Sequence, residues 1–331
     1  MDKPALMNQA ALGAMTNVLD LAPADRVLVV TDPATRTCGE AFAAAAKARG
    51  CAVRTYLLPA EGRPLKAAPA DLLALLDETD VVVNAIEGDP AEVPFRIEWI
   101  KAIEGAGRIR MGHSPGIDEE MMLHGPLAVD YDGMSRRATA LLDALEEART
   151  LLITGPGGTD LVMDVAGRRF ISDLKATVTE GANLPCGEIY CCPVETGTDG
   201  VLVVDGCFPG KGAVPAPVTI RIAGGRAGDV LCDDADTLAI VKALMDTDDG
   251  SRTICELGIG VNPGARLTGN ILEAEKTAGT AHIAFGSNEG MPGGRNVSSM
   301  HVDYLFTRPG ITAVGPDGRR TVILEDGRPP A

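Results

Sequence analysis

The sequence predicts two domains of different class: an α/β domain with a parallel sheet over residues 1–148, and a β-rich α+β domain over residues 149–331. A chain of 331 residues is long enough for roughly two domains. In the first half, short β-branched runs alternate with helical patterns, which indicates βαβ units. In the second half, β-like runs follow one another between glycines, which indicates a strand-rich domain.

The first domain is predicted to alternate helices and strands. Apolar residues at helical spacing over residues 4–20 predict a helix whose first turn tolerates Pro4. RVLVVTD has the β-branched composition of a buried strand. The same alternation predicts strands over residues 26–32, 52–58, 80–86 and 108–113, and helices over residues 39–49, 70–78 and 94–107.

The second domain is predicted to contain mainly strands. VTIRIAGGRAGDV, within residues 218–231, resembles a hairpin with a Gly-Gly turn. Residues 234–245 have the pattern of a helix. The remaining strand-like runs cover residues 150–155, 160–170, 188–195, 200–206, 254–267, 312–316 and 321–326.

Composition excludes several classes of protein. A net charge of −16 argues against a nucleic-acid partner, because phosphate binding needs clustered lysine and arginine. The eight cysteines have irregular spacing and form no C-x-x-C pair, so reduced thiols are expected rather than a disulfide framework. No signal pattern precedes the first helix, and no apolar run approaches the ~18 residues of a membrane span. We therefore expect a cytoplasmic protein with no membrane partner.

Three glycine-rich stretches imitate known motifs but lack a necessary group. GPGGTD lacks the third glycine of a dinucleotide-binding loop, and GCFPGKG is one residue short of a phosphate loop. GHSPG matches the pattern around a nucleophilic serine, but Pro115 cannot supply the oxyanion N–H that must follow the serine. We expect Ser114 to cap a helix that begins at Pro115.

The stretch AHIAFGSNEGMPGGRNVSSMHVD, residues 281–303, has the features of a metal pocket. Residues i and i+2 of a strand point to the same side, so His301 and Asp303 are predicted to project together. His282, in a neighbouring apolar run, would supply a third group. The loop between the two histidines is rich in glycine, proline and asparagine, which permit tight turns.

Two glutamates lie in apolar or glycine-rich surroundings where a surface charge is out of place. Glu188 is followed by Ile, Tyr and two cysteines, and Glu256 lies in TICELGIGVNPG. Burying a carboxylate is costly unless it is paired or binds a cation. Two histidines and three carboxylates together suit two divalent ions that share a bridging carboxylate and hydrolyse an amide or similar bond.

Two further residues are candidates for weaker reasons. His113 ends a predicted strand of the parallel sheet and could contact substrate, although a single histidine in a loop is more often structural. Glu195 follows Glu188 by seven residues and is a candidate for the general base or for binding a substrate amine.

Three segments resemble the aminopeptidase T family of metal-dependent peptidases, the M29 peptidases. They are NLPCGEIYCCPVE, ELGIGVNPGARLTGNILEAEKTAGTAHIAFG and GGRNVSSMHVD, in this order, within residues 181–306. The resemblance implies a homodimer, two divalent ions such as Zn, Co or Mn, a bridging role for Glu256, and a ligand set of Glu188, Glu256, His282, His301 and Asp303.

The sequence also departs from the family pattern. The loop between His282 and His301 is short, and Ser287, Asn288 and Glu289 occupy the region where the family has a tyrosine. Tyr304 alternates away from Asp303 in the predicted strand, so it is expected in the core.

A second branch with the same fold, the 2,5-dihydroxypyridine dioxygenases, also looks similar. It holds one Fe(II) with two histidines and an aspartate, roles that His282, His301 and Asp303 could fill. That branch lacks carboxylates at the two glutamate positions, so Glu188 and Glu256 favour a two-metal hydrolase acting on a short peptide or small amide. A third alternative is a metal-binding protein without turnover.

Overall fold

The computed structural model describes residues 2–330, which form two compact units. The first unit comprises Met1–Tyr131 with Asp173–Cys186, and the second Asp132–Ser172 with Gly187–Ala331. The chain returns to the first unit at residues 173–186 because β8 (Ala182–Asn183) pairs with β4 (Arg110–Pro115). The sequence pattern suggested a single boundary near residue 148, since a two-residue strand leaves little periodic signal.

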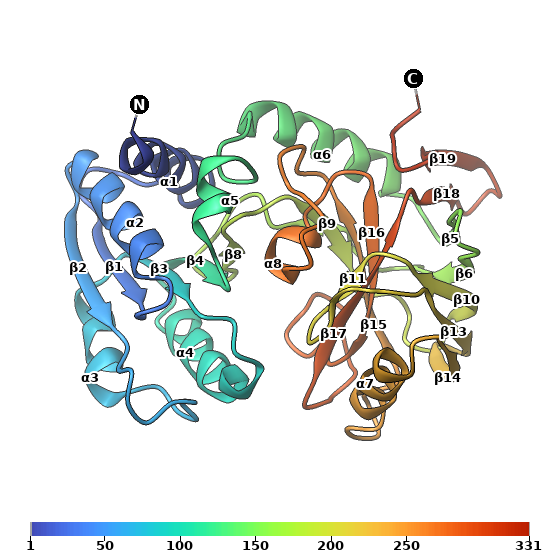
Figure 1. Ribbon diagram of the computed structural model, residues 1–331. Coiled ribbons are helices and arrows are strands. Elements are labelled where there is room, and N and C mark those ends of the chain that lie inside the picture. The colour runs from blue at the N-terminus through green and yellow to red at the C-terminus, as the bar shows by residue number, and fades with distance from the viewer. Residues whose placement is uncertain (1, 331) are drawn as a thin grey trace. The chain divides into compact units, whose positions relative to one another are not determined.

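The first unit is an α/β unit built on a parallel sheet of strand order β2-β1-β3-β4-β8, which confirms the predicted class (Figure 1). Its helices end close to the predicted positions, although α2 begins three residues early. The bounds are α1 (Lys3–Leu19), β1 (Arg26–Thr31), α2 (Arg36–Ala48), β2 (Ala52–Leu57), α3 (Ala70–Leu73), η1 (Ala74–Glu78), β3 (Val81–Ile86), η2 (Pro90–Glu92), α4 (Val93–Gly105) and α5 (Glu119–Leu123).

Helices cover both faces of this sheet. Leu28 of β1 and its paired residue Val82 of β3 pack in one buried cluster with Trp99 of α4, as expected for neighbours that share one face of the sheet. On the other face, α2 lies so close to β1 that a Cβ on Gly39 would be 2.6 Å from the side chain of Thr31. Both faces of β3 are therefore buried, which explains why its sequence is continuously apolar except for Asn84.

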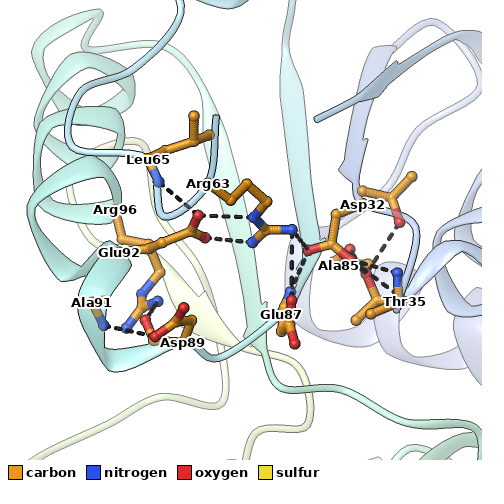
Figure 2. A network of polar contacts seen from close by, with 12 residues as sticks. Asp32, Thr35, Arg63, Leu65, Ala85, Glu87, Asp89, Ala91, Glu92 and Arg96 are labelled. Atoms are coloured by element: carbon orange, nitrogen blue, oxygen red, sulfur yellow. Dashed lines mark hydrogen bonds and ion pairs between the residues drawn. The ribbon is translucent and has the colours of Figure 1, made fainter. Parts of the chain in front are cut away.

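A buried ionic network lies where β1 and β3 end (Figure 2). Arg63 donates its Nε to Glu92 Oε1 at 2.8 Å and its Nη2 to the other oxygen of the same carboxylate. Its Nη1 lies 3.1 Å from Asp32 Oδ2 and 3.6 Å from Glu87 Oε2. Asp32 also accepts backbone N–H bonds from Thr35 and Glu87. The network thus fixes residues 58–69 against the carboxyl ends of the strands.

The second unit is strand-rich, as predicted, and contains two large antiparallel sheets of order β14-β13-β10-β6-β5-β18-β19 and β17-β16-β15-β9-β7. The predicted hairpin forms between β13 and β14 around Gly224 and Gly225, and the predicted helix is α7. The bounds are α6 (Tyr131–Leu145), β5 (Thr150–Thr154), β6 (Asp160–Asp164), β7 (Ile171–Ser172), β9 (Glu188–Cys191), β10 (Thr198–Val204), β11 (Cys207–Phe208), β12 (Gly212–Ala213), β13 (Val218–Ala223), β14 (Arg226–Leu231), α7 (Ala235–Met245), β15 (Ile254–Gly260), α8 (Ile271–Ala274), β16 (Thr280–Gly286), β17 (His301–Thr307), β18 (Gly310–Val314) and β19 (Arg320–Leu324).

Two further observations bear on the class of protein. The eight cysteines are free thiols. Among residues 2–330, the helices are too short or too polar to cross a bilayer.

Candidate metal centre

One face of the sheet β17-β16-β15-β9-β7 carries the candidate ligands, and glycine and alanine occupy the neighbouring positions on that face. On β15, Glu256, Gly258 and Gly260 alternate and share this face. On β16, His282 lies opposite Gly258, and Ala284 lies opposite Glu256. The small residues leave the space above the strands open to the side chains of their neighbours.

The flanking strands complete the set. Glu188 on β9 lies opposite Gly260. On β17, Asp303 pairs with Ala284 and His301 pairs with Gly286, so both project from the same face as expected. The structure therefore brings together, from four adjacent strands, Glu188, Glu256, His282, His301 and Asp303.

The imidazole of His282 faces three carboxylates. Its Nε2 lies 3.7 Å from Glu188 Oε2, 3.6 Å from Glu256 Oε1 and 3.7 Å from Asp303 Oδ1. These separations exceed those of direct hydrogen bonds. The side chain of His282 is 2% exposed, so these groups face one another in a largely dry site.

The imidazole of His301 faces two of these carboxylates, those of Glu256 and Asp303. Its Nε2 lies 3.2 Å from Glu256 Oε2 and 3.4 Å from Asp303 Oδ1. Its Nδ1 is 2.7 Å from the carbonyl oxygen of Ser287. Glu256 therefore offers one oxygen to each histidine, and it belongs to both groups of converging donors, Glu188–Glu256–His282 and Glu256–His301–Asp303.

The donor atoms fit divalent cations in kind and in spacing. Imidazole nitrogen and carboxylate oxygen bind Zn²⁺ at about 2.0–2.2 Å, so two donors on one ion are separated by about 3–3.6 Å. The observed nitrogen-to-oxygen separations of 3.2–3.7 Å are close to this spacing. The set contains no sulfur, which suits hard or borderline metals.

The electrostatics of the cluster show that it needs positive charge. Burial alone would raise the pKa of Glu256, but the nearby imidazoles of His282 and His301 outweigh it and lower that pKa to about 2. Burial alone would lower the pKa of His282, but Glu256, Asp303 and Glu188 raise it to about 9. The pKa of His301 is raised as well. Protonated histidines thus balance the charge of the buried carboxylates, and a divalent cation bound by these nitrogens would release the protons.

Gly258 is required by the position of His282. A Cβ at residue 258 would lie 2.0 Å from Cε1 and 2.1 Å from Nε2 of that imidazole, far inside contact distance. The imidazole therefore lies directly over the glycine. Gly258, the first glycine of ELGIG, lies in the middle of a strand and not in a turn, so the space taken by the imidazole explains why glycine occurs there.

Lys276 is a buried cation beside the cluster that the sequence did not reveal. Its Nζ lies 2.5 Å from Glu188 Oε1 and 2.9 Å from Glu275 Oε1, and its side chain is 0% exposed. Gly260 allows this approach, because a Cβ there would be 2.1 Å from the carbonyl oxygen of Thr277. The only available signal was that Lys276 is the last lysine in the chain, isolated after residue 242.

Glu195 lies between Arg168 and the loop that joins the two histidines. Its Oε2 pairs with Arg168 Nη2 at 2.6 Å. Its Oε1 accepts hydrogen bonds from the backbone N–H of Arg295 at 2.9 Å and from Asn288 Nδ2 at 3.4 Å. Both oxygens therefore contact donors that belong to the turn after β6 or to the loop between the two histidines.

His113 belongs to the first unit, on β4, where its Nδ1 lies 3.3 Å from Asn84 Nδ2. Burial and the nearby charge of Arg96 lower the pKa of His113 to about 3, so the ring is neutral. The expectation that Ser114 caps a helix is wrong, because β4 continues through Pro115 and the next helix is capped by Asp118. The chain stays extended because Ser114 and Pro115 pair with Ala85 and Ile86 of β3.

Comparisons with known proteins identify a metalloprotease family. The family model described as thermophilic metalloprotease (M29) matches residues 128–328. Aminopeptidase T of Thermus aquaticus is 28% identical over 224 residues, which is 60% of this chain and 53% of that protein. Aminopeptidase AmpS of Bacillus subtilis is 26% identical over 198 residues, or 51% and 47% of the two chains. The match thus spans about half the length of these relatives.

Two solved structures share the fold over nearly the whole chain. A 2,5-dihydroxypyridine dioxygenase from Pseudomonas putida KT2440 has a TM-score of 0.77 at 18% identity, over 99% of this chain and 98% of that one. Wild-type AmpT from Thermus thermophilus has a TM-score of 0.74 at 20% identity, over 99% of each chain. Similarity at this level of identity establishes the fold alone.

Proposed function

We propose that this protein is a metal-dependent aminopeptidase with two divalent ions. The chain belongs to the M29 metalloprotease family, because the family model matches residues 128–328. The ligands would be Glu188, Glu256, His282, His301 and Asp303, with Glu256 shared. The observation that carries the proposal is that Glu256 offers Oε1 toward His282 and Oε2 toward His301. A carboxylate placed in this way suits a bridge between two ions.

The chain's own residues would hold and orient this centre. Lys276 donates to Glu188 Oε1, which leaves Oε2 facing His282. The bond between His301 Nδ1 and the carbonyl of Ser287 assigns the proton to Nδ1 and leaves Nε2 as the donor to a metal. When bound, two divalent ions supply a water of lowered pKa and polarise the carbonyl of the substrate.

The proposed substrate is a short peptide with a free amino terminus, or a small amide. The curated relatives are named as aminopeptidases, enzymes that act on a free amino terminus. We further propose Zn, Co or Mn as the metal, and a homodimer, whose mass light scattering would measure.

A mononuclear Fe(II) dioxygenase is the second candidate. It is favoured by the fold shared with a 2,5-dihydroxypyridine dioxygenase and by the convergence of His282, His301 and Asp303. The two buried glutamates argue against it, since a facial triad uses only one carboxylate. A metal-binding protein without turnover is the third candidate.

One experiment separates these candidates. Protein purified without oxygen is loaded with Zn²⁺, Co²⁺, Mn²⁺ or Fe²⁺ and assayed against dipeptides, amino-acid anilides and dihydroxypyridines. The proposal predicts release of the N-terminal residue without oxygen uptake, abolished by a chelator. Oxygen uptake with ring opening would favour the dioxygenase, and tight metal binding without turnover would favour the third candidate.

A further inference from the structure

We propose that Arg168 and Glu195 form an ion pair that clamps the loop of residues 287–297 and thereby positions His301 in the metal centre. This inference rests on the proposed function, because it assigns to His301 the role of a metal ligand. In this proposal Glu195 positions the loop and does not act as a general base.

The two clamp residues come from outside the loop. Arg168 follows β6, and Glu195 follows β9. Their side chains are only 11% and 17% exposed, and Nη2 of the arginine lies 2.6 Å from Oε2 of the glutamate. A partly buried, hydrogen-bonded pair of this kind holds its geometry better than an exposed one.

Both clamp residues also bind the loop. Arg168 Nη1 donates to the carbonyl of Gly293. Gly293 has a φ of +85°, which favours glycine, and a Cβ there would lie 2.9 Å from Arg168 Nη1. Glu195 Oε1 accepts from the N–H of Arg295 at 2.9 Å. The pair therefore binds the backbone of one turn at two nearby residues, Gly293 and Arg295.

Asn288 connects this turn to the metal centre. Its Nδ2 donates to Cys255 O at 3.2 Å and lies 3.4 Å from Glu195 Oε1, and its Oδ1 accepts from the N–H of Asn296 at 2.8 Å. The adjacent residue, Ser287, presents its carbonyl to His301 Nδ1 at 2.7 Å. Fixing the loop thus fixes the acceptor that orients the imidazole.

The surroundings of Glu195 are unfavourable for a general base. Burial alone would raise the pKa of this carboxyl, but backbone hydrogen bonds and the charge of Arg168 lower it. A carboxylate of low pKa with both oxygens bound to donors is a weak acceptor of substrate protons.

The residues that follow the loop have a separate anchor. Asp248 binds Ser298 and Ser299, which lie just after residue 297.

Hydrogen exchange of the metal-free protein tests the clamp without reference to activity. The variants are Glu195→Ala and Arg168→Met, and Glu289→Ala removes an exposed carboxylate of the same loop as a control. Each clamp variant should speed amide exchange across residues 287–297 about tenfold or more, while the control leaves it unchanged. Unchanged exchange in both clamp variants would overturn the proposal.

Calorimetric titration with Mn²⁺ or Zn²⁺ tests the link to His301. Loss of the clamp should weaken one of two binding steps about 10- to 100-fold and leave the other unchanged, because only one donor group contains His301. Equal weakening of both steps, or of neither, would overturn the link. If the wild type bound no divalent ion, the proposed function would fail while the exchange experiment still decided the clamp.

The pH profile of kcat/KM separates positioning from proton transfer. Glu195→Gln should lower the rate but retain the acidic limb of the profile, because another group provides the base. Disappearance of that limb in Glu195→Gln would restore the general-base role and overturn the clamp assignment.

Discussion

Two buried clusters in this protein contain the same kind of acid but balance its charge differently. In the first unit, Asp32 and Glu92 are 0% and 1% exposed and share the guanidinium of Arg63. In the second, Glu188, Glu256 and Asp303 are 8–13% exposed and face the Nε2 atoms of two histidines. Arginine carries a permanent charge and five donors, whereas each histidine directs one nitrogen at these carboxylates.

The separations show the consequence. Arg63 lies 2.8 Å from a carboxylate oxygen of Glu92 and 3.1 Å from one of Asp32 (Figure 2). The carboxylate of Asp32 also accepts hydrogen bonds from backbone N–H groups. Around Glu256 the nearest histidine nitrogens lie at 3.2 Å and 3.6 Å. The cluster around Arg63, called the closed cluster below, is therefore a structural link. The cluster around Glu256, called the open cluster, has donor atoms arranged for a cation. A buried carboxylate alone does not identify a metal site. A carboxylate that is fully hydrogen-bonded within the protein is structural, whereas one whose nearest donors are distant is a candidate ligand.

The largest expected effect is at Glu256. Glu256→Ala should lower peptidase activity about 10³-fold or more and remove at least one ion, because the shared ligand is lost. Rates of dipeptide hydrolysis and elemental mass spectrometry measure both quantities. A variant that kept full metal load and activity would contradict the shared role.

The corresponding change in the closed cluster should affect stability instead. Arg63→Met leaves Asp32 and Glu92 buried without their cation, which should cost about 3–5 kcal/mol in urea unfolding and leave metal content unchanged. Arg54→Met is the control, since its pair with Glu78 is exposed and worth less than about 1 kcal/mol. Equal stability of the two variants would contradict the comparison.

Gly258→Ala sharpens the account of the open cluster. The added methyl must displace the imidazole of His282, so metal affinity should fall about 10- to 100-fold with the fold retained. Gly228→Ala, on β14, is the matched control, because a Cβ there would meet only Arg221 O at 3.6 Å. Calorimetric titration of both variants checks this, and equal affinities would refute the steric argument.

The smallest expected effect is a pH dependence confined to the open cluster. Without metal, the pKa of His282 is raised to about 9, so its contribution to stability is complete below about pH 6.5 and is lost as pH rises through 9. Glu256 acts in the opposite direction, and its contribution is lost as pH falls toward 2. Melting of metal-free protein should therefore show a loss of about 1–2 kcal/mol between pH 6.5 and 9 that His282→Asn reduces, while the raised pKa of His301 preserves the remainder.

The sequence was sufficient to predict the fold class and the gathering of five side chains. Strand periodicity predicts that His301 and Asp303 share one face. His282 was expected from a neighbouring apolar run, and the observed register of β16 with β17 brings it beside them. Glu188 and Glu256 were detectable because an acid in an apolar run must find a partner. The parallel sheet followed from alternating helices and strands.

The residues that support these side chains were not predictable in the same way. Arg63, Arg168 and Lys276 lie in polar segments, where long charged side chains usually face solvent. Their partners are distant in sequence: Lys276 meets Glu188 across 88 residues, and Arg168 meets Glu195 across 27. Only the folded chain determines which charges become buried and paired.

The most direct test of the central claim is the metal content per chain of protein purified without oxygen, measured by elemental mass spectrometry for the wild type and for Glu256→Ala. The account predicts close to two Zn, Co or Mn ions in the wild type and at most one in the variant. One iron per chain in both proteins would contradict it.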